Sequence, residues 1–88
     1  MKRVRVTVRG RVQGVFFRAD ARSRAESLGL SGWIRNAADG SVEAVFEGEP
    51  ERVDSMVEWC RRGPSGASVD EVEAAEEEPQ AARGFRVL

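Results

Sequence analysis

The sequence of 88 residues contains no histidine and a single cysteine, Cys60. Without histidine the chain lacks the usual general base, the Ser-His-Asp and Cys-His nucleophile pairs, and the commonest side-chain metal ligand. One cysteine and no histidine also argue against a zinc site. Since Cys60 has no partner for an internal disulfide, the composition is typical of a reducing compartment. Any chemistry must therefore use arginine, carboxylates, amides and the backbone.

Long apolar runs are also lacking. None approaches the roughly 20 residues needed to cross a bilayer, and the first residues, MKRVR, have no apolar segment typical of a secretory signal. The formal net charge is -1 and 33% of the residues are charged, which disfavours a general polyanion-binding surface. We therefore expect a single domain over residues 1–88, located in the cytoplasm, with no membrane contact.

Hydrophobic periodicity predicts alternating strands and helices. Residues 2–9, 30–36, 41–48 and 69–78 read as strands, with a bulge in the last, and residues 17–28 and 50–62 read as amphipathic helices. Residues 85–88 predict a short tail strand. This order predicts an α+β, ferredoxin-like βαββαβ sandwich, an antiparallel sheet with two helices on one face. In that topology the first and third strands are neighbours, which sets Arg3, Arg5 and Arg9 across from Glu43 and Glu47.

The loop at residues 10–18, GRVQGVFFR, lies between the first strand and the first helix. Its two glycines allow a tight turn with exposed N–H groups, and the following helix adds free amides and the positive end of its dipole, so the loop can cradle an anion. Arg18 can add a bidentate guanidinium. A plain turn between strand and helix is the alternative. Asn36, at the end of the second strand, either faces the same pocket or caps the turn at residues 37–40.

Two stretches resemble the acylphosphatase family. Residues 10–18 match its signature Gly-x-Val-Gln-Gly-Val-x-Phe-Arg. Residues 32–43, GWIRNAADGSVE, match the second signature, Gly-Trp-Val-Arg-Asn-x-x-Asp-Gly-x-Val-Glu. The departures are Ile34 in place of the commoner Val, and Ala37 where some members carry a hydroxyl that would steady Asn36. The similarity runs over essentially the whole chain.

The resemblance implies a metal-independent and cofactor-free hydrolase that splits the carboxyl–phosphate anhydride of acyl phosphates. It implies that Arg18 and Asn36 are catalytic, with Asn36 positioning the attacking water. The implied substrate-binding residues are Arg11, Val12, Gln13, Gly14, Val15, Phe16, Phe17 and Arg18. Inorganic phosphate would then be a product or inhibitor. We expect Trp33 and Phe16 to be packing residues and Arg35 to point away from the pocket.

Two other functions remain open from the sequence. The chain can be a non-catalytic module that binds a phosphorylated metabolite, since related domains occur fused to other enzymes. RNA binding on the open sheet face is disfavoured, because the first strand has no aromatic residue there and the third has none if Phe46 is buried. We expect no nucleic-acid partner and a monomer.

Overall fold

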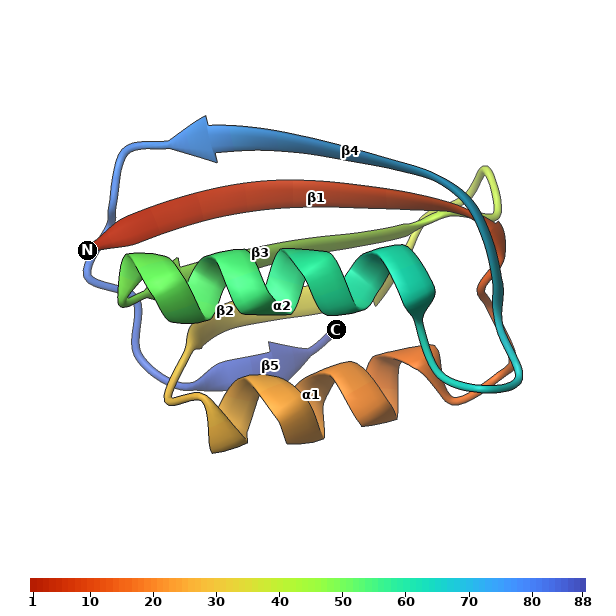
Figure 1. Ribbon diagram of the computed structural model, residues 1–88, viewed down its shortest axis with the longest axis horizontal. Helices are drawn as coiled ribbons and strands as arrows, with labels where there is room; N and C mark the ends of the chain where they lie inside the picture. Colours follow the sequence, from red (N-terminus) through yellow and green to blue (C-terminus); the bar gives the residue numbers. More distant parts are fainter.

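The computed structural model describes residues 1–88 and shows two helices on one face of a five-stranded sheet (Figure 1). The elements are β1 (Lys2–Arg11), α1 (Phe17–Ser27), β2 (Ser31–Asn36), β3 (Val42–Gly48), α2 (Pro50–Arg62), β4 (Ser68–Glu77) and β5 (Phe85–Val87). The strand order is β4-β1-β3-β2-β5. The predicted ferredoxin-like fold is confirmed, with one addition: β5 pairs in parallel with β2, so the full sheet is mixed.

The core lies between the sheet and the helices. Val4, Val6 and Val8 of β1 are buried, as the period of two predicts, and the residues that alternate inward on β3 join them. The helices contribute Phe17, Ala21 and Ala25 of α1 and Val53, Met56 and Cys60 of α2. No helix of the chain combines the length and apolar character needed to span a bilayer.

Cys60 is a core residue, as expected. Its side chain is fully buried, and this burial raises the pKa of the thiol to about 12. A thiol with such a pKa is protonated at neutral pH and is not a nucleophile.

The predicted bulge lies in β4. Arg9 of β1 pairs with Glu71, but the next residue, Gly10, pairs with Val69, so Asp70 is the extra residue on β4. The bulge explains why Val69 and Val72 are three apart and yet belong to one strand.

Ion pairs cover the open face of the sheet. Arg3 contacts Glu47 at 3.1 Å and Glu77 at 3.2 Å, and Arg5 contacts Glu77 at 2.6 Å and Glu43 at 3.3 Å. The predicted facing of Arg3 and Arg5 with β3 is therefore confirmed.

The same prediction is wrong for Arg9. This side chain pairs with Glu71 and Glu73 of β4. The reason is that β1 extends past the end of β3, whose last partner on β1 is Val8, so only β4 offers carboxylates to Arg9.

Aromatic residues are scarce on this open face. Phe46 is fully buried on the helix side, and the guanidinium groups of Arg5 and Arg35 both lie over the ring of Trp33, 5.4 and 5.5 Å from its centre. An RNA base has no free ring to stack on, which disfavours the RNA-binding alternative further.

Glu47 holds the connection between β4 and β5 against the sheet. Its carboxylate accepts the backbone N–H groups of Gln80 at 2.9 Å and Ala82 at 3.0 Å, in addition to the guanidinium of Arg3, and its side chain is only 2% exposed. These bonds, the Gln80 amide first, lower the pKa of Glu47. The anchored segment then leads into β5, which is the far edge of the sheet (Figure 1).

We predict that Glu47→Gln destabilises the fold by about 3 kcal/mol at neutral pH, because it removes one partner of a buried charge pair. Since the folded-state pKa of Glu47 is lowered, its stabilisation is present above its ordinary value of 4.5 and is lost as the pH falls below that value. Urea unfolding at pH 7 and at pH 3 measures the destabilisation and its pH dependence. The difference in the free energy of unfolding between wild type and variant should be smaller at pH 3 than at pH 7.

Glu78→Gln is the matched control, because Glu78 is an exposed carboxylate in the same connection. It should change the free energy of unfolding by less than about 0.5 kcal/mol at either pH. If the difference in the free energy of unfolding between wild type and Glu47→Gln were the same at pH 7 and pH 3, the assigned role of the carboxylate would be contradicted.

Candidate active site

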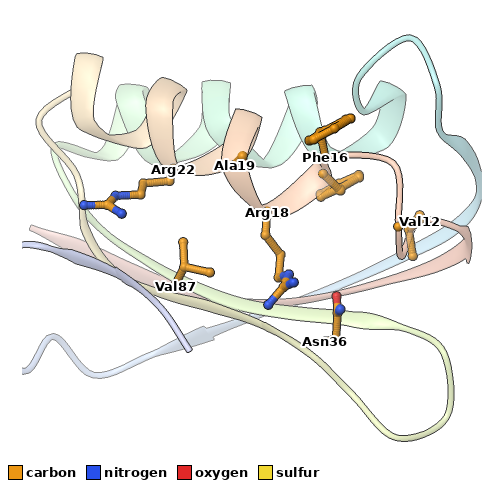
Figure 2. Close-up of a pocket in the computed structure, with 9 residues that line it drawn as sticks. Val12, Phe16, Arg18, Ala19, Arg22, Asn36 and Val87 are labelled. Carbon is orange, nitrogen blue, oxygen red and sulfur yellow. The ribbon is translucent and has the colours of Figure 1, made fainter.

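A pocket of about 530 Å³ opens where the start of α1 meets the ends of β2 and β5. Figure 2 shows Arg18 reaching from α1 toward the strand that carries Asn36. The lining residues are Val12, Gly14, Phe16, Phe17, Arg18, Ala19, Arg22, Asn36 and Val87. The pocket thus brings together the two regions that the sequence singles out.

The loop before α1 leaves several amides free. Phe16 is the N-cap residue of α1, in a left-handed conformation with φ 61°, and no side chain caps the first turn. The first intrahelical bond runs from the N–H of Asp20 to the carbonyl of Phe16, so the preceding N–H groups of the helix have no acceptor within it. These donors, with the helix dipole, favour an anion at this end of α1.

Gly10 is required by the close approach of two strands. It has φ 132°, and a Cβ at this position would lie 2.2 Å from the carbonyl oxygen of Ser68 on β4. The first glycine of the loop is therefore a packing requirement of the β1–β4 edge. Gly14, with φ 73°, serves the turn itself and lines the pocket.

Gln13 ties the loop to the turn between β2 and β3. Its side-chain N–H group donates to the carbonyls of Ala37 and Ser41, both at 2.9 Å. The loop after β1 and the segment that follows Asn36 are thereby held together, although they are more than 20 residues apart in sequence.

Arg18 is half-buried, and its guanidinium donates to the main-chain oxygen of Leu88 at 3.3 Å. Asn36 is exposed, and its side chain makes no hydrogen bond to another group of the protein. Its amide is therefore available to a ligand.

The turn after Asn36 is capped by another residue. Asp39 accepts the backbone N–H of Ser41 at 3.0 Å and its hydroxyl at 2.6 Å, and the hydroxyl bond is the main reason that the pKa of Asp39 is lowered. The alternative in which Asn36 caps the turn is therefore wrong.

The predicted binding residues divide into two groups. The pocket is lined by Val12, Gly14, Phe16, Phe17 and Arg18. By contrast, Arg11, Gln13 and Val15 are outside the lining: Arg11 is exposed beside β4, and Val15 packs against the core. Their predicted part in binding stays a prediction.

The prediction that Phe16 is a packing residue is wrong. Its side chain is 80% exposed at the pocket, because the left-handed backbone turns it away from the core. Trp33 is not at the pocket, and Arg35 points to the open face as predicted, with its guanidinium 2.6 Å from Glu43.

Three lining residues escaped the sequence analysis: Ala19, Arg22 and Val87. Ala19 and Arg22 lie one and four residues after Arg18, so helical spacing alone places Arg22 beside it. Val87 comes from β5, whose neighbour in the sheet no local pattern reveals.

The charged residues that line the pocket are all basic. Its lining contains two arginines and no acidic residue. No group of three or more His, Cys, Asp or Glu side chains in the chain is arranged to hold a metal ion. The arrangement suits an anionic ligand held by guanidinium and amide donors.

Comparison with known proteins identifies the family. A sequence model of the acylphosphatase family matches residues 4–87. An acylphosphatase of Rubrobacter xylanophilus is 64% identical over 88 residues, which cover 98% of this chain and 79% of that protein. The chain belongs to the acylphosphatase family.

Solved structures agree with this assignment. The crystal structure of an acylphosphatase from Bacillus subtilis superimposes with a TM-score of 0.96 at 32% identity and covers 100% of this chain and 99% of the other. An acylphosphatase from Coxiella burnetii gives a TM-score of 0.94 at 41% identity, over 99% and 92% of the two chains. The fold predicted from the order of strands and helices is thus the fold of the family, and the chain is an acylphosphatase hydrolase.

We predict that Gln13→Ala loosens the loop of this acylphosphatase without unfolding it. The variant loses two partly buried hydrogen bonds, each worth about 1 kcal/mol. Hydrogen–deuterium exchange of the amides in residues 12–16 should become faster, whereas the exchange of β1 and β3 should be unchanged. Equal protection of the loop in both proteins would show that Gln13 does not hold it.

Proposed function

We propose that the protein hydrolyses acyl phosphates to a carboxylate and inorganic phosphate, with Arg18 and Asn36 as catalytic residues. The observation that carries this proposal is the convergence of three kinds of group on one pocket: a guanidinium from α1, an uncommitted amide from β2, and free backbone N–H groups at the helix start.

The phosphate group of the substrate occupies the cradle. Backbone amides of the loop from about Arg11 to Phe17 donate to its non-bridging oxygens, and the guanidinium of Arg18 binds two of them in a bidentate manner. Such donors are in place before the reaction and stabilise the charge that builds on these oxygens in the transition state.

Asn36 orients the attacking water. Its side-chain oxygen accepts a hydrogen bond from the water, which then attacks phosphorus in line with the leaving carboxylate. The new oxygen–phosphorus bond forms as the phosphorus–carboxylate bond breaks, and the carboxylate departs with the electron pair. A non-bridging oxygen of the phosphate takes the proton of the water, so the products are a carboxylate and inorganic phosphate.

This reaction fits a site without histidine. The substrate is a mixed anhydride whose leaving group is a carboxylate, so the leaving oxygen needs no strong protein acid and the water needs no strong protein base. Position and charge stabilisation are the remaining requirements, and the cradle and the amide supply them.

Arg18→Ala is expected to abolish measurable hydrolysis of benzoyl phosphate and to weaken the binding of inorganic phosphate about tenfold or more, through loss of a charge-assisted bond. Turnover is followed by the release of benzoate in the presence of a chelator, and phosphate binding by calorimetry. Arg24→Ala is the matched control, because Arg24 is on the same helix but lies over Trp59. Arg24→Ala should leave the turnover of benzoyl phosphate and the affinity for inorganic phosphate near the wild-type values.

Asn36→Ala is expected to retain phosphate binding and to lower kcat by a factor of about 10²–10³. Its control is Arg35→Ala, since the neighbouring Arg35 points to the opposite face of the sheet. If Asn36→Ala lost phosphate binding as completely as Arg18→Ala, the division of roles between the two residues would be wrong.

The same assays test a second function. A wild-type protein that binds phosphate but does not accelerate the hydrolysis of benzoyl phosphate would be a binding module. Activity that disappears with the chelator would contradict the proposed independence from metal ions.

We further propose that residues 1–88 act as one domain and that the protein is a cytoplasmic monomer in which phosphate inhibits as a product. The single buried Cys60 supports a reducing compartment. Light scattering measures the oligomeric state.

A further inference from the structure

The pocket contains a second guanidinium that the proposed reaction does not use. Arg22 lines the same pocket as Arg18 and is located one helical turn after it on α1. Figure 2 shows the two arginines on the pocket side of the helix, and in this view Val87 lies between their side chains. Asn36 and the loop are on the other side of Arg18, so Arg22 marks the end of the pocket remote from the phosphate cradle.

Arg22 forms only one weak ion pair within the protein. Its one partner is Glu26 on the same helix, at 3.4 Å, and both side chains are 53% exposed. An exposed pair of this kind is worth less than about 1 kcal/mol and exchanges readily for another carboxylate. By contrast, Arg3 and Arg5 of the open face each contact carboxylates from both β3 and β4.

The surroundings of Arg22 leave room for the acyl group of a substrate. Ala19, which lies beside the two arginines on α1, has a small side chain and also lines the pocket. Side chains four apart on a helix have Cβ atoms about 5–6 Å from each other. The two arginines therefore project from neighbouring positions of α1 along one wall of the pocket.

We propose that Arg22 recognises a second anionic group on the acyl part of the substrate, so that the enzyme prefers acyl phosphates derived from dicarboxylic acids. The phosphate binds the loop and Arg18, the acyl chain runs past Ala19 and Val87, and the remote carboxylate replaces Glu26 as the partner of Arg22. This inference rests on the proposed hydrolysis of acyl phosphates and adds a substrate class to it.

The test compares two substrates that differ only in the remote charge. Fumaroyl monophosphate carries a free carboxylate, and its trans double bond prevents that carboxylate from attacking its own acyl carbon; the matched substrate is its methyl ester. Measuring the ratio of kcat/KM for the acid to that for the ester in each variant removes the difference in intrinsic reactivity between the two compounds.

Two substitutions should move this ratio in opposite directions. Arg22→Gln lowers it about 2–5-fold, the range expected for one exposed ion pair. Glu26→Gln removes the competing carboxylate and raises it about 1.5–3-fold. The change should be in KM for the acid, because the remote group is bound equally in the ground state and the transition state. Glutamine is a good helix former, so both variants keep α1.

Arg24→Gln is the control, since it removes a positive charge from the same helix on the side that faces Trp59, and it should leave the ratio unchanged. Hydrolysis of both substrates with the same ratio in wild type and Arg22→Gln would overturn the role of Arg22 and leave the proposed activity intact. A Glu26→Gln ratio at or below that of wild type would also overturn it. If wild type hydrolyses neither compound nor benzoyl phosphate, the proposed function itself fails, and this inference fails with it.

Discussion

The antiparallel pairing of β1 with β3 is the constraint on which the rest of the structure depends. The residues of β1 alternate, and Val42, Ala44 and Phe46 of β3 face the same side as its valines, so one face is apolar and is covered by helices. The other face carries the arginines of β1 with Glu43 and Glu47 of β3. A shift by one residue would bury the arginines and expose the valines. With the register set, α1 has to begin just beyond the end of β1, and the loop before it is brought to the end of β2 where Asn36 lies.

The open face is more than a solvated surface. Glu47 accepts two backbone amides of the connection that follows β4 and also pairs with Arg3. That connection delivers β5 to its place beside β2, where Gly32 donates to the carbonyl of Gly84 at 3.0 Å. Through β5, Val87 reaches the pocket and the main chain of Leu88 reaches Arg18. A buried carboxylate on one face of the sheet therefore supports the position of groups on the other.

The composition of the pocket matches the small chemical demand of the proposed reaction. Guanidinium groups and amides can bind a phosphate and align water, but they cannot take protons at neutral pH. A substrate that already carries a good leaving group requires nothing more from the protein. The specificity of such a site then depends on the part of the pocket beyond the phosphate cradle, where Arg22 is found.

The sequence by itself determined the order and type of the elements, because alternating and helical periodicity reflect which side of each element is buried. It also determined the two segments of the candidate site, since their motifs are local. It could not reveal that Phe16 is exposed, because that depends on a left-handed residue at the start of α1. Only the tertiary structure decided that Arg9 pairs with β4, that Glu47 anchors the connection to β5, and that Val87 lines the pocket. The physical reason is the same in each case: these contacts join residues whose separation in sequence is large, and their partners are set by the lengths and positions of whole strands.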